Sequence, residues 1–414
     1  MSIKEKNILN IYIFLNIFFI FTNYIYNIQV PFIILLTLLL LLTTIKPKFK
    51  ININFNEILF LNLGIVFFIS AILSSAMNDA IKYSIGFFCL IINMIIFSRK
   101  NEINYQKIEK YILFFSSIHV FATIIYQIYP DIIRKLLPLF LRGSDLTRNM
   151  FEFNNNKINC GITPIQSLNA FYISCFIMII FVNLIKNKNK KVLNICFLII
   201  GYIALFLASK RGVLLANIVS SFYTFSYDKY KNKKLSILTI LKSSLIIIII
   251  SFIGYVFISK YIPSALNIFN RFNQSDMTTG RSNIYKIVLS KFFNTNIILG
   301  AGLFSSRSIL EVNIGVVSDV HNIYIQLLVE MGIYGLISFL ITIIIIYSKF
   351  IKVKINKYNN KLLDYALYFI TLFILYGLTG NDLFDLTMSS IYFFMIAIVF
   401  SIIRKEKIWK KLEY

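Results

Sequence analysis

Apolar runs of membrane-crossing length recur along the whole 414-residue chain, and short polar or basic segments separate them. The pattern predicts an all-α, polytopic membrane protein forming a single integral membrane domain over residues 1–414. The first run has no small-residue cleavage site after it, so we expect a retained span and not a signal peptide. With roughly 20 apolar residues needed per crossing, the pattern predicts about twelve transmembrane helices, near 8–22, 28–45, 57–76, 80–98, 111–130, 165–185, 192–209, 213–227, 243–259, 321–348, 362–379 and 388–403.

Basic residues gather in alternate gaps between these spans. With the N-terminus placed inside, the inner segments carry 28 of the 42 Lys and Arg residues, including the runs at 186–191 and 229–234. Cytoplasmic loops of membrane proteins are enriched in such residues, so we predict that both termini are cytoplasmic. Two external loops, 131–164 and 260–320, are then long. Since long loops usually carry function, we expect the working face to be external.

Composition agrees with the membrane class and narrows the partners. The chain is 58% hydrophobic and only 14% charged, with a mean hydropathy of +0.75. Its net charge of +24 would suggest nucleic acid in a soluble protein. Here the cytoplasmic loops account for that charge, so we expect no nucleic-acid partner. The four cysteines show neither pairing nor metal-ligand spacing, which indicates packing residues.

A polar island at 278–335 stands out from the hydrophobic chain and contains His321, one of only two histidines. Ionisable residues away from the cytoplasmic side of a membrane protein usually have a functional reason. A histidine whose pKa is near neutrality can act as a general base. Asp319, two residues earlier, is placed to orient it. The bland alternative is a solvated loop histidine.

Polar residues at a spacing of four follow the histidine. Asn322, Gln326 and Glu330 form a stripe beside His321 if the segment is helical. Gly332 and Gly335 would let this helix pack closely against a neighbouring helix.

Three further positions offer cationic contacts to an anion. Lys210-Arg211-Gly212 lies in a short turn between the seventh and eighth spans, and Thr278-Thr279-Gly280-Arg281 opens an expected helix. Guanidinium groups and helix starts both favour phosphate. Arg271, just upstream, is a further candidate. A snorkelling arginine in a turn is the structural alternative for Arg211, and a surface arginine is the alternative for Arg281.

Other polar groups carry weaker signals. His119 lies inside the fifth span without a nearby carboxylate, so we expect a buried structural role. The loop 131–164 could be a lid or an anion funnel. The last external turn adds the carboxylates of Asp382 and Asp385. No metal-ligand cluster is visible, so we expect neither a metal nor a cofactor.

Taken in order, Lys210-Arg211-Gly212, Thr279-Gly280-Arg281, Leu299-Gly300-Ala301-Gly302, His321-Asn322 and Glu330-Met331-Gly332 with Gly335 resemble the O-antigen polymerase/ligase family. The resemblance covers about residues 200–345 in motif detail. It implies a fold similar to the GT-C type of membrane glycosyltransferase. It also implies a glycan donor carried on undecaprenyl diphosphate, a glycan acceptor, metal-independent chemistry and an active site on the periplasmic side of the inner membrane. Direct displacement of the diphosphate by an acceptor hydroxyl predicts inversion at the anomeric carbon. His321 matches the family's catalytic histidine, and Arg211 and Arg281 match its two phosphate-binding arginines.

The resemblance leaves the branch of the family open. Some polymerases carry Arg-x10-Gly in an outer loop, and here only Lys291 has this spacing, to Gly302. We favour a polymerase of O-antigen or capsular repeat units, with a ligase acting on lipid A–core or another acceptor as the alternative. A chain-length regulator and a flippase are the expected partners. From another class, the chain could itself be a transporter or flippase, or an assembly partner without catalysis.

Overall fold

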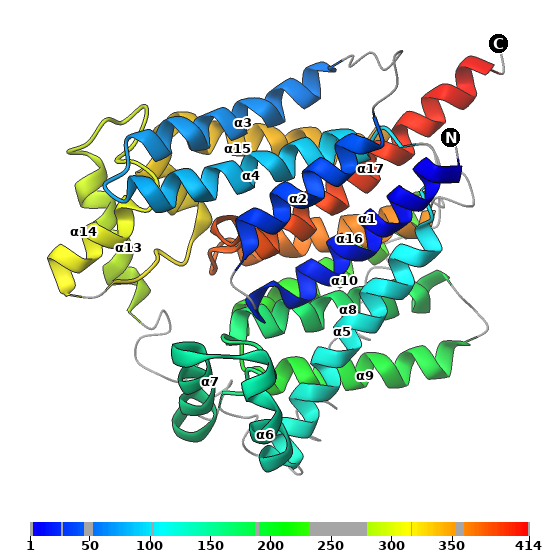
Figure 1. The fold of residues 1–414 in the computed structure, drawn as a ribbon, viewed down its shortest axis with the longest axis horizontal. Coiled ribbons are helices and arrows are strands. Elements are labelled where there is room, and N and C mark those ends of the chain that lie inside the picture. Colours follow the sequence, from blue (N-terminus) through cyan, green and yellow to red (C-terminus); the bar gives the residue numbers. More distant parts are fainter. Residues whose placement is uncertain are drawn as a thin grey trace.

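The structure is a computed structural model, and it describes residues 3–25, 28–44, 53–100, 103–156, 158–186, 190–231, 280–315, 317–352 and 360–412. Within these ranges the protein is a helical bundle without a β-strand (Figure 1), which confirms the predicted class. The helices are α1 (Ile3–Thr22), η1 (Asn23–Ile25), α2 (Gln29–Leu42), α3 (Phe55–Ile72), α4 (Met77–Phe97), α5 (Tyr105–Ile128), α6 (Pro130–Phe140), α7 (Gly143–Asn156), α8 (Gln166–Lys186), α9 (Lys191–Leu207), α10 (Arg211–Lys231), α13 (Arg281–Phe292), α14 (Ser305–Ile314), α15 (Ile323–Lys352), α16 (Asn360–Tyr376), η4 (Asp382–Phe384) and α17 (Leu386–Leu412).

Eleven of the predicted spans coincide with helices, and the ninth, 243–259, lies outside the described residues. Among the described helices, seven are long and apolar enough to cross a membrane: those at Glu5–Ile25, Phe55–Ile72, Met77–Phe97, Tyr105–Ile128, Gln166–Lys186, Ile323–Ile351 and Leu386–Lys405. The apolar helices α2 and α9 are shorter. Membrane crossing is therefore supported, while the number of twelve and the cytoplasmic termini stay predictions.

Helix α10 is less apolar than its neighbours because one of its faces is polar and buried. Asn217 donates a hydrogen bond to Ser174 of α8 at 2.8 Å. Tyr368 of α16 donates to the Asn217 side chain at 2.9 Å. Inside a membrane protein, polar side chains are tolerated where neighbouring helices satisfy them. This polar face therefore joins α8, α10 and α16.

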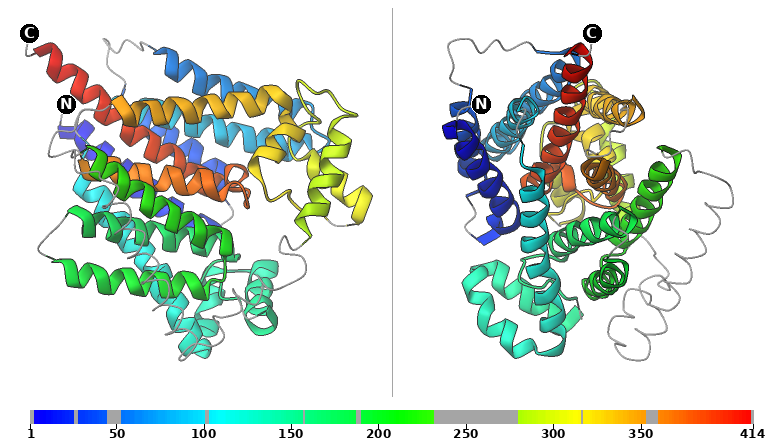
Figure 2. Two further views of the ribbon diagram at one scale, coloured as in Figure 1. Left: turned by 180° about the vertical axis from the view of Figure 1, so that it is seen from behind. Right: turned by 90° about the vertical axis from the view of Figure 1, so that its right-hand side faces the viewer.

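Ion pairs bind helix ends together at one end of the bundle. Glu57, at the start of α3, accepts from Arg99 at 2.7 Å and from Arg404 at 3.1 Å. Lys186, at the end of α8, pairs with Asp228 and, at 2.7 Å, with Asp364. Both chain termini lie at this end, and α13 and α14 lie at the other (Figures 1 and 2). The helix directions therefore alternate as the sequence pattern predicts.

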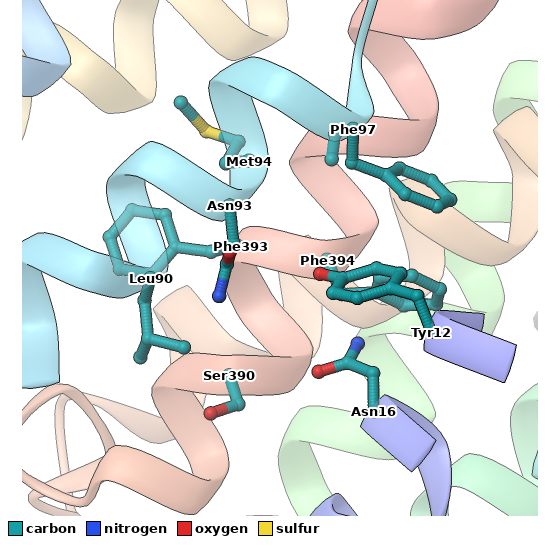
Figure 3. A pocket seen from close by; sticks show the side chains of 10 residues that line it. Tyr12, Asn16, Leu90, Asn93, Met94, Phe97, Ser390, Phe393 and Phe394 are labelled. Atoms are coloured by element: carbon teal, nitrogen blue, oxygen red, sulfur yellow. The ribbon is translucent and has the colours of Figure 1, made fainter. Parts of the chain in front are cut away.

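A small cavity lies within the bundle between α1, α4 and α17. Asn16, Asn93 and Ser390 line it together with aromatic side chains (Figure 3). Its volume is about 10 Å³, which corresponds to about one water molecule. It is too small for a sugar or a prenyl chain, so a substrate of that kind must bind elsewhere.

Candidate functional site at the outer end of the bundle

The site is organised around the turn that follows α16, residues 377–380. Asn322 is the N-terminal cap of α15, because its side-chain oxygen accepts from the backbone N–H groups of Tyr324 at 3.0 Å and Ile325 at 3.1 Å. The amide nitrogen of the same side chain donates to the carbonyl of Leu378 at 3.2 Å. The N–H of Ile323 donates to the carbonyl of Gly377 at 2.8 Å. The start of α15 is thereby fixed on this turn, with His321 directly before it.

Arg281 reaches the same turn from a different part of the chain. It is the first residue of α13, and its guanidinium donates to the carbonyl of Thr379 at 3.1 Å. The start of α10 packs there too, since a Cβ atom at Gly212 would lie 2.1 Å from the hydroxyl oxygen of Thr379. Parts of three motifs far apart in sequence, at 210–212, 280–281 and 321–322, therefore meet at one turn.

Strained backbone conformations mark the same region. Within the described residues, Ser209, Phe304 and His321 are the non-glycine residues with positive φ, at 54°, 64° and 57°. Ser209 directly precedes Lys210-Arg211, and Phe304 follows the glycine motif at 300–302. Non-glycine residues in this region cost about 1–3 kcal/mol and cluster at functional sites. The strain supports a functional interpretation of these motifs.

The electrostatic environment keeps His321 neutral. Its pKa is lowered to about 4, first by burial and then by the positive charges of Arg281 and Lys210, while Asp319 acts in the opposite direction. A neutral imidazole can accept a proton at physiological pH. Because Arg281 and Lys210 both lower this pKa, both cations lie close enough to His321 to act on it electrostatically. The side chains of His321, Arg281, Lys210 and Arg211 are all half-buried.

Tyr285 of α13 contacts the histidine from its backbone side. Its hydroxyl donates to the carbonyl of His321 at 3.4 Å, a long hydrogen bond. The chain that follows α7 lies near the same cations, because the charge of Lys210 acts on the thiol of Cys160. Burial nevertheless raises the pKa of that thiol to about 12, so Cys160 is not a nucleophile.

Asp319 has a different partner from the one expected. Its carboxylate accepts from the Nε of Arg307 at 2.7 Å, and the Arg307 guanidinium lies 4.7 Å from the ring centre of Phe304. Asp319 therefore connects the segment before His321 to α14. Its expected role in orienting the histidine stays a prediction.

Glu330 and Gln326 do not extend a polar stripe from His321 toward an open site. Both are completely buried. The Glu330 carboxylate accepts from Ser306 and from Gln326, and the Glu330 backbone carbonyl accepts from Ser70 at 2.8 Å. Glu330 therefore ties α15 to α14 and α3, which is a structural role.

The glycine motif at 300–302 is inserted into a break in α15. Gly332 has φ 67° and ψ −170°, which interrupts the helix. The freed backbone groups pair with the inserted segment: Ala301 N–H donates to the Val329 carbonyl at 2.9 Å, and Ile333 N–H donates to the Ile297 carbonyl at 2.9 Å. The motif is therefore a fixed insertion. The close approach expected of Gly332 is made with this segment and not with a neighbouring helix.

The two sides of this insertion leave no room for a side chain. A Cβ atom at Gly332 would lie 2.1 Å from the carbonyl oxygen of Ile298, and one at Gly300 would lie 2.5 Å from the Glu330 carbonyl carbon. From Gly332 to the end of the span at Ile351 there are enough residues for about 30 Å of helix. The part of α15 before the break, which starts beside His321, therefore extends beyond one membrane thickness.

The turn at 377–380 could not be predicted as part of the site. Its only signal in the sequence is the pair of glycines in the gap between the last two spans. Asp382, which follows the turn, is buried, and burial raises its pKa well above the usual range. Asp385 caps α17 by accepting from Thr387 N–H at 2.8 Å. Arg271 and the threonines at 278 and 279 lie outside the described residues.

No group of three or more His, Cys, Asp or Glu side chains suited to a metal ion occurs in the part of the chain that the structure describes. His119 is buried among aromatic rings, with the Tyr172 ring centre 4.4 Å away. Its position matches the structural role expected of it.

Comparison with known proteins adds independent support for the motif resemblance. Residues 170–340 match the family model for O-antigen ligase. The matched region begins in α8 and ends within α15, and it includes Arg211, Arg281 and His321 but not the turn at 377–380. A search of curated proteins finds no match. The match over residues 170–340 therefore supports the resemblance of this chain to the O-antigen polymerase/ligase family.

Proposed function

We propose that this protein is a membrane glycosyltransferase that moves an undecaprenyl-diphosphate-linked glycan onto a sugar hydroxyl at the outer face of the cytoplasmic membrane. The observation that carries the proposal is the convergence of His321, Arg281 and the start of α10 on the turn at 377–380. Family membership supports the reaction class. The chemistry would be metal-independent.

His321 would act as the general base. Its lowered pKa keeps the imidazole nitrogen free to accept the proton of the acceptor hydroxyl. The acceptor oxygen forms a bond to the anomeric carbon of the donor while the bond from that carbon to the diphosphate oxygen breaks. Undecaprenyl diphosphate leaves with the bonding electrons. Direct displacement predicts inversion at the anomeric carbon.

Arg281 and Arg211 would bind the departing diphosphate. Negative charge on the leaving group grows as the bond breaks, so cations placed beside it stabilise the transition state more than the ground state. Lys210 adds a third cation, because its charge already acts on His321. Arg281 and Lys210 also lower the pKa of His321, so binding of the diphosphate beside them would raise this pKa and strengthen His321 as a proton acceptor.

The acceptor defines two candidate activities. We propose a polymerase that joins O-antigen or capsular repeat units as the first. A ligase that transfers finished polymer to lipid A–core or another acceptor is the second, and the description of the matching family model favours it. Both use the same chemistry. A chain-length regulator and a flippase are the proposed partners of the polymerase.

The two activities leave different glycans in a cell that lacks the gene. Collapse of long chains to single repeat units indicates a polymerase, and long polymer retained on undecaprenyl diphosphate indicates a ligase. The deletion strain is complemented with wild type, His321→Ala, or Lys82→Gln as a control, at equal protein levels in the membrane. Restoration of surface glycan by His321→Ala would overturn the assigned role of His321.

A further inference from the structure

Helix α6 carries an apolar stripe that stays largely exposed in the described part of the protein. Ile132, Leu136 and Leu139 are 51%, 40% and 68% exposed, and they recur at the spacing of one helix face. The segment containing them was expected to be an external loop. Contiguous exposed apolar surface marks a site of interaction with protein or membrane.

The stripe continues a surface that faces lipid. Helix α5 is long and apolar enough to span the membrane. It exposes a row of large apolar residues along one face: Phe114, Ile118, Phe121, Ile125 and Ile128. The chain turns at Tyr129, which is 62% exposed, and α6 with its own exposed apolar stripe follows directly. The outward face of a spanning helix contacts acyl chains, so the stripe on α6 comes immediately after a helix face suited to lipid.

The packing of α6 sets its depth. Its buried residues Ile133 and Leu137 belong to one cluster with Ala122 and Tyr126, which lie in the last two turns of α5. At 1.5 Å per residue, Ala122 lies about 9 Å before the end of α5. Helix α6 therefore lies beside the end of a spanning helix (Figures 1 and 2) and not above it in solution.

The rest of the α6 surface suits the same position. Arg134 donates to Asn154 of α7 at 2.6 Å and lies over the Phe153 ring at 5.9 Å. Lys135 is exposed beside the apolar stripe. An 11-residue helix is too short to cross the hydrocarbon core. A short helix with an apolar face, a charged edge and this depth lies in the plane of the membrane interface.

We propose that α6 is an interfacial helix whose stripe of Ile132, Leu136 and Leu139 inserts into the lipid leaflet on the His321 side of the membrane. The stripe would contact the part of the acyl chains nearest the headgroups of that leaflet, and Lys135 would lie at the level of the lipid phosphates. The proposal is independent of the glycosyltransferase reaction.

Tryptophan fluorescence in nanodiscs of lipids brominated at defined acyl positions tests the insertion. Trp409 is the single native tryptophan. Every reporter variant is therefore made in the full chain carrying Trp409→Phe. Leu139→Trp reports on the stripe, and Ile118→Trp, on the lipid-facing row of α5, is the control inside the membrane. Thr147→Trp is the aqueous control, because Thr147 is exposed on α7 and bonds only within that helix.

We expect shallow bromines to quench Leu139→Trp more than deep ones, deep bromines to quench Ile118→Trp more, and neither to quench Thr147→Trp. Leu136→Trp should repeat the Leu139→Trp result if either variant folds poorly. Quenching of Leu139→Trp by aqueous iodide and not by lipid would overturn the proposal. Protection from both quenchers would overturn it as well, because a protein surface would then cover the stripe.

Discussion

The guanidinium of Arg281 donates a hydrogen bond to the backbone carbonyl of Thr379, 98 residues further along the chain, at 3.1 Å. The hydroxyl group of Thr379 packs against Gly212. Thr379 therefore determines how close the starts of α10 and α13 come to each other and to His321, although it carries no charge and makes no recognisable motif.

A side chain at Gly212 should disturb this arrangement. We expect Gly212→Ala to lower glycan transfer strongly, because its Cβ would lie 2.1 Å from the Thr379 hydroxyl oxygen. The combination Gly212→Ala with Thr379→Ala should recover much of the loss, because the oxygen that clashes is gone. Surface glycan length, measured at equal protein level, compares the wild type with the two variants. A double variant as inactive as Gly212→Ala would contradict the steric explanation.

The pH dependence of transfer should reflect the lowered pKa of His321. The neutral base predominates above a pKa of about 4, so kcat/KM should stay level from neutral pH down to about pH 5 and fall as the pH approaches 4. Removing the positive charge of Lys210 should raise the pKa of His321 and move this acid limb to higher pH. The pH profile of Lys210→Gln in proteoliposomes measures the shift, with Lys82→Gln, at a side chain that is 72% exposed, as the matched control. An unchanged acid limb in Lys210→Gln would show that His321 is not the titrating base.

The break in α15 should tolerate only glycine. We expect Gly332→Ala to destabilise the protein by at least about 3 kcal/mol, because a glycine-only conformation and a clash with the Ile298 carbonyl add together. Gly315→Ala is the matched control: its φ is also 67°, but nothing lies within 4 Å of the added Cβ, so its cost should be about 1 kcal/mol. Apparent melting temperatures in detergent separate the two. Equal losses would show that the clash contributes nothing.

The ion pair of Arg307 and Asp319 should act as a unit. Both side chains are partly exposed, at 41% and 29%, so the pair itself contributes about 1 kcal/mol or less. If Asp319 acts through Arg307, then Asp319→Asn, Arg307→Gln and the double variant should reduce transfer by similar factors. The kcat/KM values of the four proteins form the test. Additive losses would instead support a direct contact between Asp319 and His321.

Much of the fold could be predicted because its cause is local. A helix of about 20 apolar residues satisfies its own backbone hydrogen bonds in lipid, so eleven predicted spans appear as helices. Helix α6 was not predicted because the criterion was the length of an apolar run. Its apolar period is present in the sequence, but the segment is too short to span, and the length criterion assigned it to a loop.

The motifs of the site could be located, but their individual roles could not. Asn322 and Glu330 occur on the same predicted helix face, yet Asn322 caps α15 at the turn after α16, while Glu330 is buried against Ser306 and Ser70. The difference arises from a glycine with φ 67° and from a segment inserted 30 residues earlier in the chain. Neither leaves a periodic signal in the sequence.

The sequence by itself determined the helical membrane class and located most of the spans and the site motifs, because hydrophobic length and short motifs are read along the chain. Only the tertiary structure decided which polar residues meet. It pairs Asp319 with Arg307 and buries Glu330 against Ser306. It also places Thr379 between Gly212 and Arg281. The physical reason is that these contacts join residues tens to hundreds of positions apart. Such contacts depend on how the helices pack in three dimensions and not on the residues that are neighbours in the sequence.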